Sequence, residues 1–348
     1  MGQKRRMRFG YMPDANFGHF DMPTPTPAHT NACLMQMVEE AQLAEAVGFH
    51  GVFLPDRHMR TETVGPDPLT ILAALATATQ RVDLGTYVLI QSLYDPMAVA
   101  ERTALIDNLS GGRLILGVGQ GYNELYWRMF GLRSEHRLSR FIEGLDVLKK
   151  AWTSTEPFTF VGEHFEYHDV FLSPLPFQRD PHPRIWGGAI AEGAIRRAGT
   201  YASGFAAGVT VHELDVWREQ VGLFLEGANE AGITEPEMAM MRNGFCAETR
   251  QEATASFGEA FLDEVRYTFD RGLPHPIIET RSDIALSALS PALVIGTPDD
   301  CAEQLHRLES EFNVDYVVLR FRVTAGPDRQ STLRAIRLFG EEVIPRFR

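Results

Sequence analysis

Three adjacent side chains of different chemistry, Asp56, Arg57 and His58, follow a short apolar run at residues 51–55. An imidazole can exchange a proton near neutral pH, a carboxylate can orient it, and a guanidinium stays cationic and binds anions. The group therefore suits acid–base catalysis, anion binding or an internal hydrogen-bonded network. A structural ion pair is the commoner explanation for any single charged residue, but the three together favour a functional site.

Glycines gather in residues 109–124, which read LSGGRLILGVGQGYNE. They surround an apolar run that predicts a buried strand over residues 114–118. Gly119 and Gly121 would let a flat or phosphorylated ligand approach the backbone, and a turn that serves only packing is an equal alternative. The dinucleotide pattern GxGxxG fails because Tyr122 stands at its last glycine. We expect no helix to be capped by this loop, so a Rossmann site is disfavoured.

A second glycine pair, Gly187 and Gly188, joins a predicted strand to the start of a predicted helix. Backbone N–H groups at such a junction can hold a phosphate with the help of the helix dipole. Tight packing of the helix on the strand explains Gly188 equally well.

Metal sites and serine nucleophiles find little support. The chain has 11 histidines but no HxH or HExxH pattern. His164 and His168 lie in a predicted hairpin, so they do not share a helix face. No G-x-S-x-G stretch occurs. We therefore expect neither a metal site nor a nucleophilic serine.

The composition is that of a globular protein, since 44% of the 348 residues are hydrophobic and 23% are charged. The net charge of -13 argues against nucleic acid and membrane partners, which require basic patches. No uncharged apolar run is long enough to span a bilayer, and no secretion signal is visible. Three cysteines without a CxxC pair suit a reducing compartment, and we expect a cytoplasmic protein.

The elements that must position these residues alternate between strand and helix. Apolar runs predict strands at residues 7–12, 51–55, 83–90, 114–118, 184–188, 204–209, 238–247 and 314–320. Helical spacing predicts helices at residues 30–47, 67–78, 96–109, 138–152, 191–201, 212–231, from 251 onward, and 331–344. This rhythm predicts a (β/α)8 barrel, with an open doubly wound sheet as the second possibility. In a barrel, functional residues gather where the strands end.

Two stretches interrupt the alternation within one expected domain, residues 1–348. Residues 155–183, before the fifth strand, combine a predicted hairpin around Gly162 with a proline-rich connector. Residues 263–292 lie between the seventh and eighth strands.

Five stretches together resemble the bacterial luciferase-like flavin-dependent monooxygenases, a family of (β/α)8 barrels. The longest reads LGTYVLIQSLYDPMAVAERTALIDNLSGGRLILGVGQGYNELYWRMFG, residues 84–131. The others are residues 140–152, 160–178, 183–199 and 294–305, in the order of the family. The resemblance covers nearly the whole chain and is weakest at residues 263–292, where the family carries a mobile active-site lid.

The resemblance implies a flavin, FMN, at the mouth of the barrel. Family members place its ring against the third strand, often beside a non-proline cis peptide. The matching bond here joins Tyr87 and Val88. Gly119, Gln120 and Tyr122 match family positions that line the flavin. Gly188 and Ala189 match positions near its phosphate end.

Three departures from luciferase limit what can be carried over. This chain has Arg57 where luciferase has a histidine, although the next histidine is matched by His58. Gly119 stands where luciferase has a reactive cysteine, and Gln120 where an arginine reaches the phosphate. These differences argue against light emission, and they leave more of the phosphate binding to backbone N–H groups near Gly188.

The resemblance implies a monooxygenase that receives reduced FMN from a separate reductase and uses oxygen to oxygenate an organic substrate. In this reading, His58 donates a hydrogen bond or acts as acid or base, and Arg57 orients an anionic substrate. A homodimer is expected from the family. Aromatic residues near the strand ends suit a partly apolar substrate, although packing explains each equally well: Phe17, Phe20, Tyr122, Tyr126 and Trp127.

Two alternatives stay open. Related barrels bind a deazaflavin and transfer hydride without oxygen; Arg57, Arg320 and Arg322 could hold such a long, acidic cofactor. The third possibility is a flavin-binding barrel without turnover.

Overall fold

The computed structural model describes residues 6–208, 213–271, 278 and 280–347. Its main sheet is ten-stranded, and eight of its strands form a closed parallel ring. In ring order these are β1 (Arg8–Tyr11), β2 (Gly51–Leu54), β3 (Asp83–Thr86), β5 (Leu114–Gly119), β8 (Arg184–Gly187), β9 (Gly204–Ala207), β10 (Glu237–Cys246) and β12 (Tyr316–Arg320). Because β12 pairs with β1, the sheet closes, and the predicted (β/α)8 barrel is confirmed.

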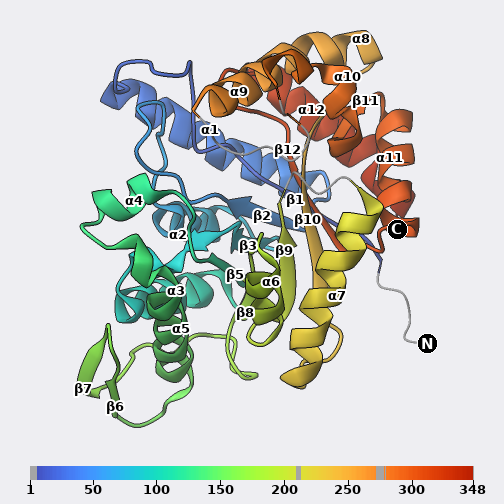
Figure 1. Cartoon of the computed structure of the whole chain (residues 1–348). Helices are drawn as coiled ribbons and strands as arrows, with labels where there is room; N and C mark the ends of the chain where they lie inside the picture. Colours follow the sequence, from blue (N-terminus) through green and yellow to red (C-terminus); the bar gives the residue numbers. More distant parts are fainter. Residues whose placement is uncertain (1–5, 209–212, 272–277, 279, 348) are drawn as a thin grey trace.

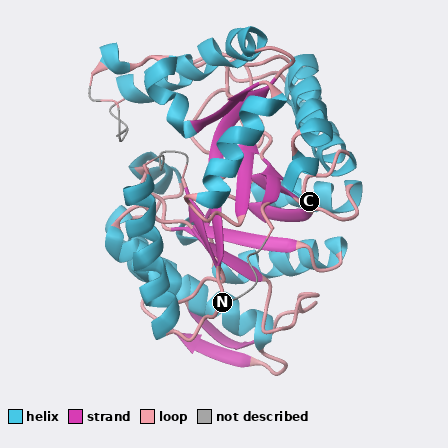
Figure 2. Cartoon of the chain, turned by 90° about the vertical axis from the view of Figure 1, so that its right-hand side faces the viewer, coloured by secondary structure: helices cyan, strands magenta, loops and turns pink. Residues whose placement is uncertain are grey.

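Helices surround the strands on the outside of the barrel (Figures 1 and 2). They are α1 (Pro27–Ala46), α2 (Pro68–Ala78), α3 (Pro96–Ser110), α5 (Arg137–Thr153), α6 (Glu192–Gly199), α7 (Leu214–Glu230), α11 (Pro298–Ser310) and α12 (Arg329–Glu342). Four of them begin with a proline directly after a side chain that caps the first turn, which fixes where each helix starts. The capping residues are Thr26, Asp67, Asp95 and Thr297. None of the described helices is both long and apolar enough to cross a membrane.

Three large aromatic side chains fill the barrel interior. The rings of Phe53 and Trp186 stack with centroids 5.1 Å apart, and Tyr316 meets both edge-on. Glycines on neighbouring strands make the room, because a Cβ at Gly10 or Gly85 would lie 2.8 or 2.6 Å from the Phe53 ring. These rings fill the barrel interior, so a ligand of the barrel would bind on their C-terminal side, where the strands end.

Three details differ from the sequence-based expectation. The predicted third strand is interrupted, and its second part, β4 (Leu89–Ile90), pairs only with β5. The glycine loop after β5 leads directly into a short helix, α4 (Glu124–Met129), whose first turn is capped by Asn123. The expectation that this loop caps no helix is therefore wrong. An additional strand, β11 (Leu293–Gly296), pairs with β10 outside the closed ring.

The first interruption forms an antiparallel hairpin of β6 (Phe158–Val161) and β7 (Glu166–Val170), which lies apart from the barrel sheet (Figures 1 and 2). Glu143 of α5 accepts hydrogen bonds from the backbone N–H groups of residues 163–165 at its turn. The hairpin is thereby fixed to α5.

The connection from β10 to β12 contains α8 (Arg250–Ala253), a π-helical turn (Thr254–Gly258), α9 (Glu259–Asp270) and α10 (Leu286–Leu289). The range 263–292, expected to be a lid, begins inside α9, and its residues 272–277 and 279 lie outside the described part of the chain. Its mobility stays a prediction. Short 3-10 turns complete the fold: Gln91–Leu93, Ser134–His136, Arg281–Asp283, Ser290–Ala292 and Ile344–Phe347.

Candidate active site

His58 lies just after β2 and is held by a buried carboxylate. Its Nε2 lies 2.8 Å from Asp56 Oδ1, while the other oxygen of Asp56 accepts the backbone N–H of Ile90 at 2.9 Å. The Tyr94 hydroxyl donates to the same carboxylate and lies 3.1 Å from His58 Nε2. Asp56 thus links the His58 ring to the segment that follows Val88.

The second ring nitrogen of His58 is left free. Only 4% of the residue is exposed, yet Nδ1 has no hydrogen-bond partner among the described residues. Tyr126 and Phe130 of the α4 region meet the imidazole edge-on, with centroids 5.3 and 5.1 Å away. Because Nε2 lies against the Asp56 carboxylate and the Tyr94 hydroxyl, Nδ1 is the nitrogen left to exchange a proton.

Arg57, the neighbour of His58, has a different environment. The residue is partly buried, and no hydrogen bond or ion pair with any described residue reaches its guanidinium. Burial alone would lower the pKa of Arg57, but the charges of Asp14 and Glu264 raise it above its ordinary value. Arg57 therefore stays cationic at any pH at which the protein is folded.

Arg320 and Arg322, by contrast, are committed to internal partners. Arg320 donates to Asn243 at 2.7 Å, to Asp14 at 3.2 Å and to Glu264 of α9 at 2.7 Å. Arg322 donates to the carbonyl of Asn16 and lies 3.8 Å from the centre of the Phe17 ring. Neither guanidinium is available to hold an acidic cofactor, which corrects that expectation and leaves Arg57.

The bond between Tyr87 and Val88 is a non-proline cis peptide, as expected. Val88 packs between two strand ends, since a Cβ at Gly119 or Gly188 would lie 2.9 Å from its side chain. Part of the reason for these glycines is thus the close approach of Val88. The Tyr87 hydroxyl crosses the barrel and donates to the carbonyl of Ala207 at 2.7 Å.

The remaining predicted cofactor residues surround this point. Gln120 follows β5, and its carbonyl accepts a hydrogen bond from Ser92 after β4. Tyr122 is 64% exposed, and Ala189, after β8, is partly buried. The helix that follows, α6, begins after Ala191 without a side-chain cap, and a Cβ at Gly193 in its first turn would meet nothing within 4 Å. An anionic group can therefore approach the N–H groups of this helix start.

The aromatic residues expected at the mouth separate into different roles. Trp127 is 1% exposed and packs with Leu93 and Tyr126 beside His58. Phe20 instead stacks on Tyr267 of α9, with centroids 4.1 Å apart. Tyr94, Phe130 and Glu264 were missed by the sequence interpretation; for Tyr94 a usable signal existed, because it closely follows the predicted third strand.

One group of side chains bears on the expectation of no metal. The possible ligand atoms of His136, Glu163 and His164 all lie within 4.8 Å of one another. His164 Nε2 already pairs with the Ser139 hydroxyl at 2.6 Å, and His168 pairs with Glu166 on β7. This group belongs to the hairpin and α5, and not to the strand ends.

Comparisons with known proteins agree with this geometry. The sequence model of the luciferase-like monooxygenase family matches residues 12–312. A 4-hydroxyprotoasukamycin monooxygenase from Streptomyces nodosus subsp. asukaensis is 27% identical and covers 95% of this chain and 92% of that protein. The oxygenase component of a flavin-dependent trigonelline monooxygenase from Acinetobacter baylyi is 25% identical, covering 90% and 89%. An F420-dependent glucose-6-phosphate dehydrogenase from Microbacterium testaceum is 27% identical, covering 90% and 93%.

Solved structures show the same fold. Monooxygenase RslO1 from Streptomyces bottropensis superposes with a TM-score of 0.83 at 25% identity, over 98% of this chain and 100% of that one. The oxygenating constituent of 3,6-diketocamphane monooxygenase from Pseudomonas putida, in complex with FMN, has a TM-score of 0.77 at 19% identity, with 98% of both chains covered. The closed barrel, the cis bond at the end of its third strand and the family match agree, and the chain belongs to the luciferase-like monooxygenase family.

Proposed function

We propose that the protein is the oxygenase component of a two-component system. It takes reduced FMN from a separate flavin reductase and uses oxygen to oxygenate a small, partly apolar organic substrate. The observation that supports this most directly is the position of His58, whose free Nδ1 lies in an apolar cluster beside the segment that follows the cis Tyr87–Val88 bond.

The residues at the strand ends fit FMN. The flat face formed by Val88, Gly119 and Gly188 would take the ring, with Tyr87, Gln120 and Tyr122 around it. Ala189 and the uncapped start of α6 would hold the phosphate through backbone N–H groups. Reduced FMN, when bound, supplies the electrons that activate oxygen.

His58 is the candidate acid or base of the reaction. Asp56 and Tyr94 hold the ring through Nε2, which leaves Nδ1 without a partner among the described residues. Tyr126, Trp127 and Phe130 keep water away from this nitrogen, and exclusion of water protects reactive oxygen species from wasteful decay.

The test is a titration of the purified protein with FMN, reduced FMN and a deazaflavin, followed by fluorescence and by absorption under anaerobic conditions. We expect reduced FMN to bind preferentially, and addition of oxygen to produce a new absorption band that decays faster when a substrate is present. Tight binding of the deazaflavin without reaction with oxygen would instead assign hydride transfer, as the names of some relatives suggest. Binding of flavin without turnover of any substrate would leave a carrier.

A homodimer is part of the proposal. Leu105 and Leu109 on the outer side of α3 are 50% and 53% exposed, which suits a contact with a second copy. Light scattering that gives the mass of a single chain at micromolar concentration would contradict it.

A further inference from the structure

Arg57, beside His58, is a cation without a hydrogen bond or ion pair to any residue that the structure describes. Asp14 and Glu264 are the carboxylates whose charges act on Arg57. Asp14 accepts from the N–H of Asn16 and from Arg320. Glu264 accepts from Arg320 and, at 3.3 and 3.4 Å, from the backbone N–H and hydroxyl of Thr324. All four carboxylate oxygens therefore have partners other than Arg57.

The guanidinium of Arg57 thus combines a permanent charge with unused donors. A guanidinium carries five N–H groups in a planar fork that matches the two oxygens of a carboxylate. None of its nitrogens is among the buried side-chain atoms that lack a partner, so the donors are open to solvent and to a bound anion.

The surroundings of Arg57 connect it to His58. Tyr126 packs edge-on against His58, the chain neighbour of Arg57. Tyr126 also belongs to the apolar cluster with Leu93 and Trp127. A ligand that spans these groups would offer an anion to Arg57, an apolar body to Tyr126 and its reacting part to His58.

We propose that the substrate is an organic carboxylate, held by Arg57 through its carboxylate group with its apolar body against Tyr126. This inference rests on the proposed function, because it names the substrate class of that same site. The other anion of the system is the phosphate of the cofactor. In the ring of strands, β3 and β5 separate β2, which positions Arg57, from β8, which leads to the uncapped start of α6. The two anion sites are therefore distinct.

The test compares Arg57→Gln and Arg57→Lys with wild type. Arg133→Gln serves as the matched control, because the Arg133 side chain is 74% exposed and pairs with Glu135 away from the barrel interior. The probes are matched acid and amide pairs: benzoate and benzamide, phenylacetate and phenylacetamide, 1-naphthoate and 1-naphthamide. Their dissociation constants are measured by equilibrium dialysis, with and without FMN.

We expect wild type and Arg133→Gln to bind at least one acid about tenfold more tightly than its amide. Arg57→Gln should lose that preference, and Arg57→Lys should keep a part of it because the charge remains but the fork is lost. The midpoint of thermal unfolding should fall only slightly in Arg57→Gln, because no internal hydrogen bond is removed and Arg320, the larger cause of the lowered Glu264 pKa, remains. Equal affinity for acids and amides in wild type, or an unchanged preference in Arg57→Gln, would overturn the proposal.

A second arm separates the two sources of the anion. FMN and riboflavin differ by the phosphate, so their affinities are compared in wild type and Arg57→Gln. We expect the ratio of the two affinities to change by less than about twofold. Loss of the preference for FMN in Arg57→Gln would assign Arg57 to the cofactor and refute the substrate role. Because the acid and amide pairs are also measured without FMN, failure of the protein to bind flavin would be recognised separately.

Discussion

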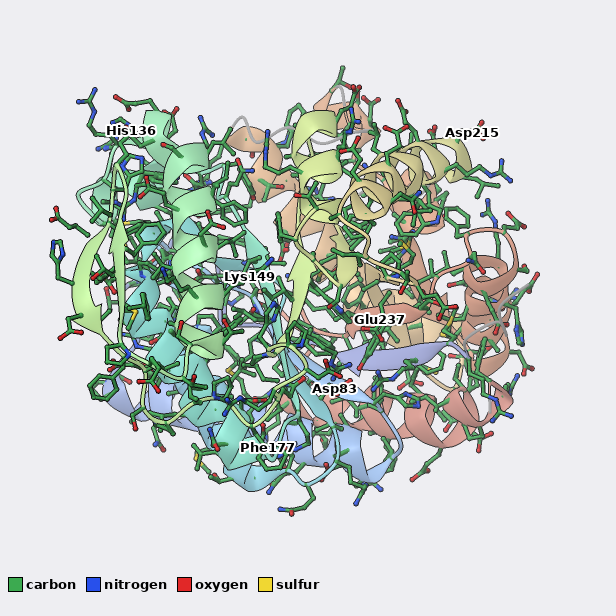
Figure 3. The ribbon with its side chains drawn as sticks, turned by 90° about the horizontal axis from the view of Figure 1, so that it is seen from below. Asp83, His136, Lys149, Phe177, Asp215 and Glu237 are labelled. Carbon is green, nitrogen blue, oxygen red and sulfur yellow. The ribbon has the colours of Figure 1, made fainter. Side chains whose placement is uncertain are left out.

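The two ends of the barrel use the same residue types with opposite results. At the N-terminal end, Asp83 lies between Arg8 and Arg184, at 2.5 and 2.6 Å. Glu237 lies 3.7 and 3.9 Å from the same two arginines (Figure 3). Two cations and two anions thus pair with one another, although the Tyr316 hydroxyl beside them is buried without a partner among the described residues.

At the C-terminal end, some polar groups lack a hydrogen-bond partner. Arg320 satisfies Asp14 and Glu264, while Arg57 and His58 Nδ1 have no hydrogen-bond partner among the described residues. A complete network contributes to stability, whereas an incomplete one is available to a ligand. The ends of this barrel therefore differ in how far their charged side chains are paired with one another.

A pocket lies at the other end of the barrel, where the charged side chains are paired. A pocket of about 610 Å³ opens near the start of β1, between α1 and α12, and is lined by Arg8, Glu45 and Arg81 among others. Glu45 already accepts hydrogen bonds from the N–H groups of residues 80–82. This pocket lies at the end where the charges are paired, so we assign it no role in catalysis.

The largest effect on activity should come from a substitution at the C-terminal end, where His58 lies. His58→Ala removes the candidate acid or base, and general acid–base catalysis contributes about 100-fold or more to a rate. We expect the yield of oxygenated product per reduced FMN consumed to fall by at least that factor, with little change in FMN affinity. His168→Ala is the control, because His168 is exposed on β7. Retention of half the wild-type rate in His58→Ala would contradict the assignment.

A substitution at the N-terminal end of the barrel should affect stability alone. Asp83→Ala leaves Arg8 and Arg184 with only the more distant Glu237. Since both arginines are about one-third exposed, solvent weakens these pairs, and we expect a loss of about 2 kcal/mol in the free energy of unfolding. Urea unfolding measures this loss, while kcat/KM of the folded protein should stay within twofold of wild type. A tenfold fall in kcat/KM would show that the two ends are coupled.

Low pH should reduce the stability of the protein through Glu264, at the C-terminal end of the barrel. Burial alone would raise the pKa of Glu264, but Arg320 and Arg57 lower it from its ordinary value of 4.5 to about 2. The stabilisation from this lowered pKa is fully present above about pH 4.5 and is lost as the pH falls towards 2.

Glu264→Gln should therefore cost about 1–2 kcal/mol at pH 7 and reduce the loss of stability between pH 4.5 and 2. The free energy of unfolding, measured by urea at several pH values, checks both. Glu156→Gln, at an exposed position before β6, is the control. Identical pH dependence in wild type and Glu264→Gln would exclude this role.

The sequence predicted the strands and helices of the barrel better than the site at its C-terminal end. Buried parallel strands read as apolar runs, so all eight barrel strands were found within a few residues. The starts of α2 and α3 were predicted within one residue because proline and a capping side chain act locally, but α1 starts at Pro27 and not at residue 30, and α11 was not predicted. The same local reasoning missed β11, a strand of four residues that pairs only with the outer side of the ring.

The candidate site could be predicted only in part. Asp56, Arg57 and His58 stand together in the sequence, and the resemblance supplied Tyr87 and Val88. The partners that decide their roles are distant: Arg320 is 56 residues from Glu264 and 306 from Asp14. Short sequence patterns do not show pairs between such distant residues. The sequence therefore could not show that Arg57 lacks an internal partner, or that Arg320 and Arg322 have internal partners. The helix α4 was missed because the packing of its aromatic side chains around His58 is tertiary.

The smallest effect should come from removal of one tyrosine hydroxyl, which separates its contribution to stability from its contribution to catalysis. Tyr94 donates to Asp56 at 3.1 Å beside His58, and Tyr167 donates to Asp95 at 2.8 Å on the outside of the barrel. Tyr94→Phe and Tyr167→Phe each remove one hydroxyl that donates to a carboxylate, and each should cost no more than about 1 kcal/mol of unfolding free energy. Only Tyr94→Phe should lower kcat, by about threefold, because Asp56 keeps two of its three partners and still orients His58. If both variants turn over at the wild-type rate, Tyr94 serves only stability; if Tyr167→Phe is the slower one, the division between the strand ends and the rest of the surface fails.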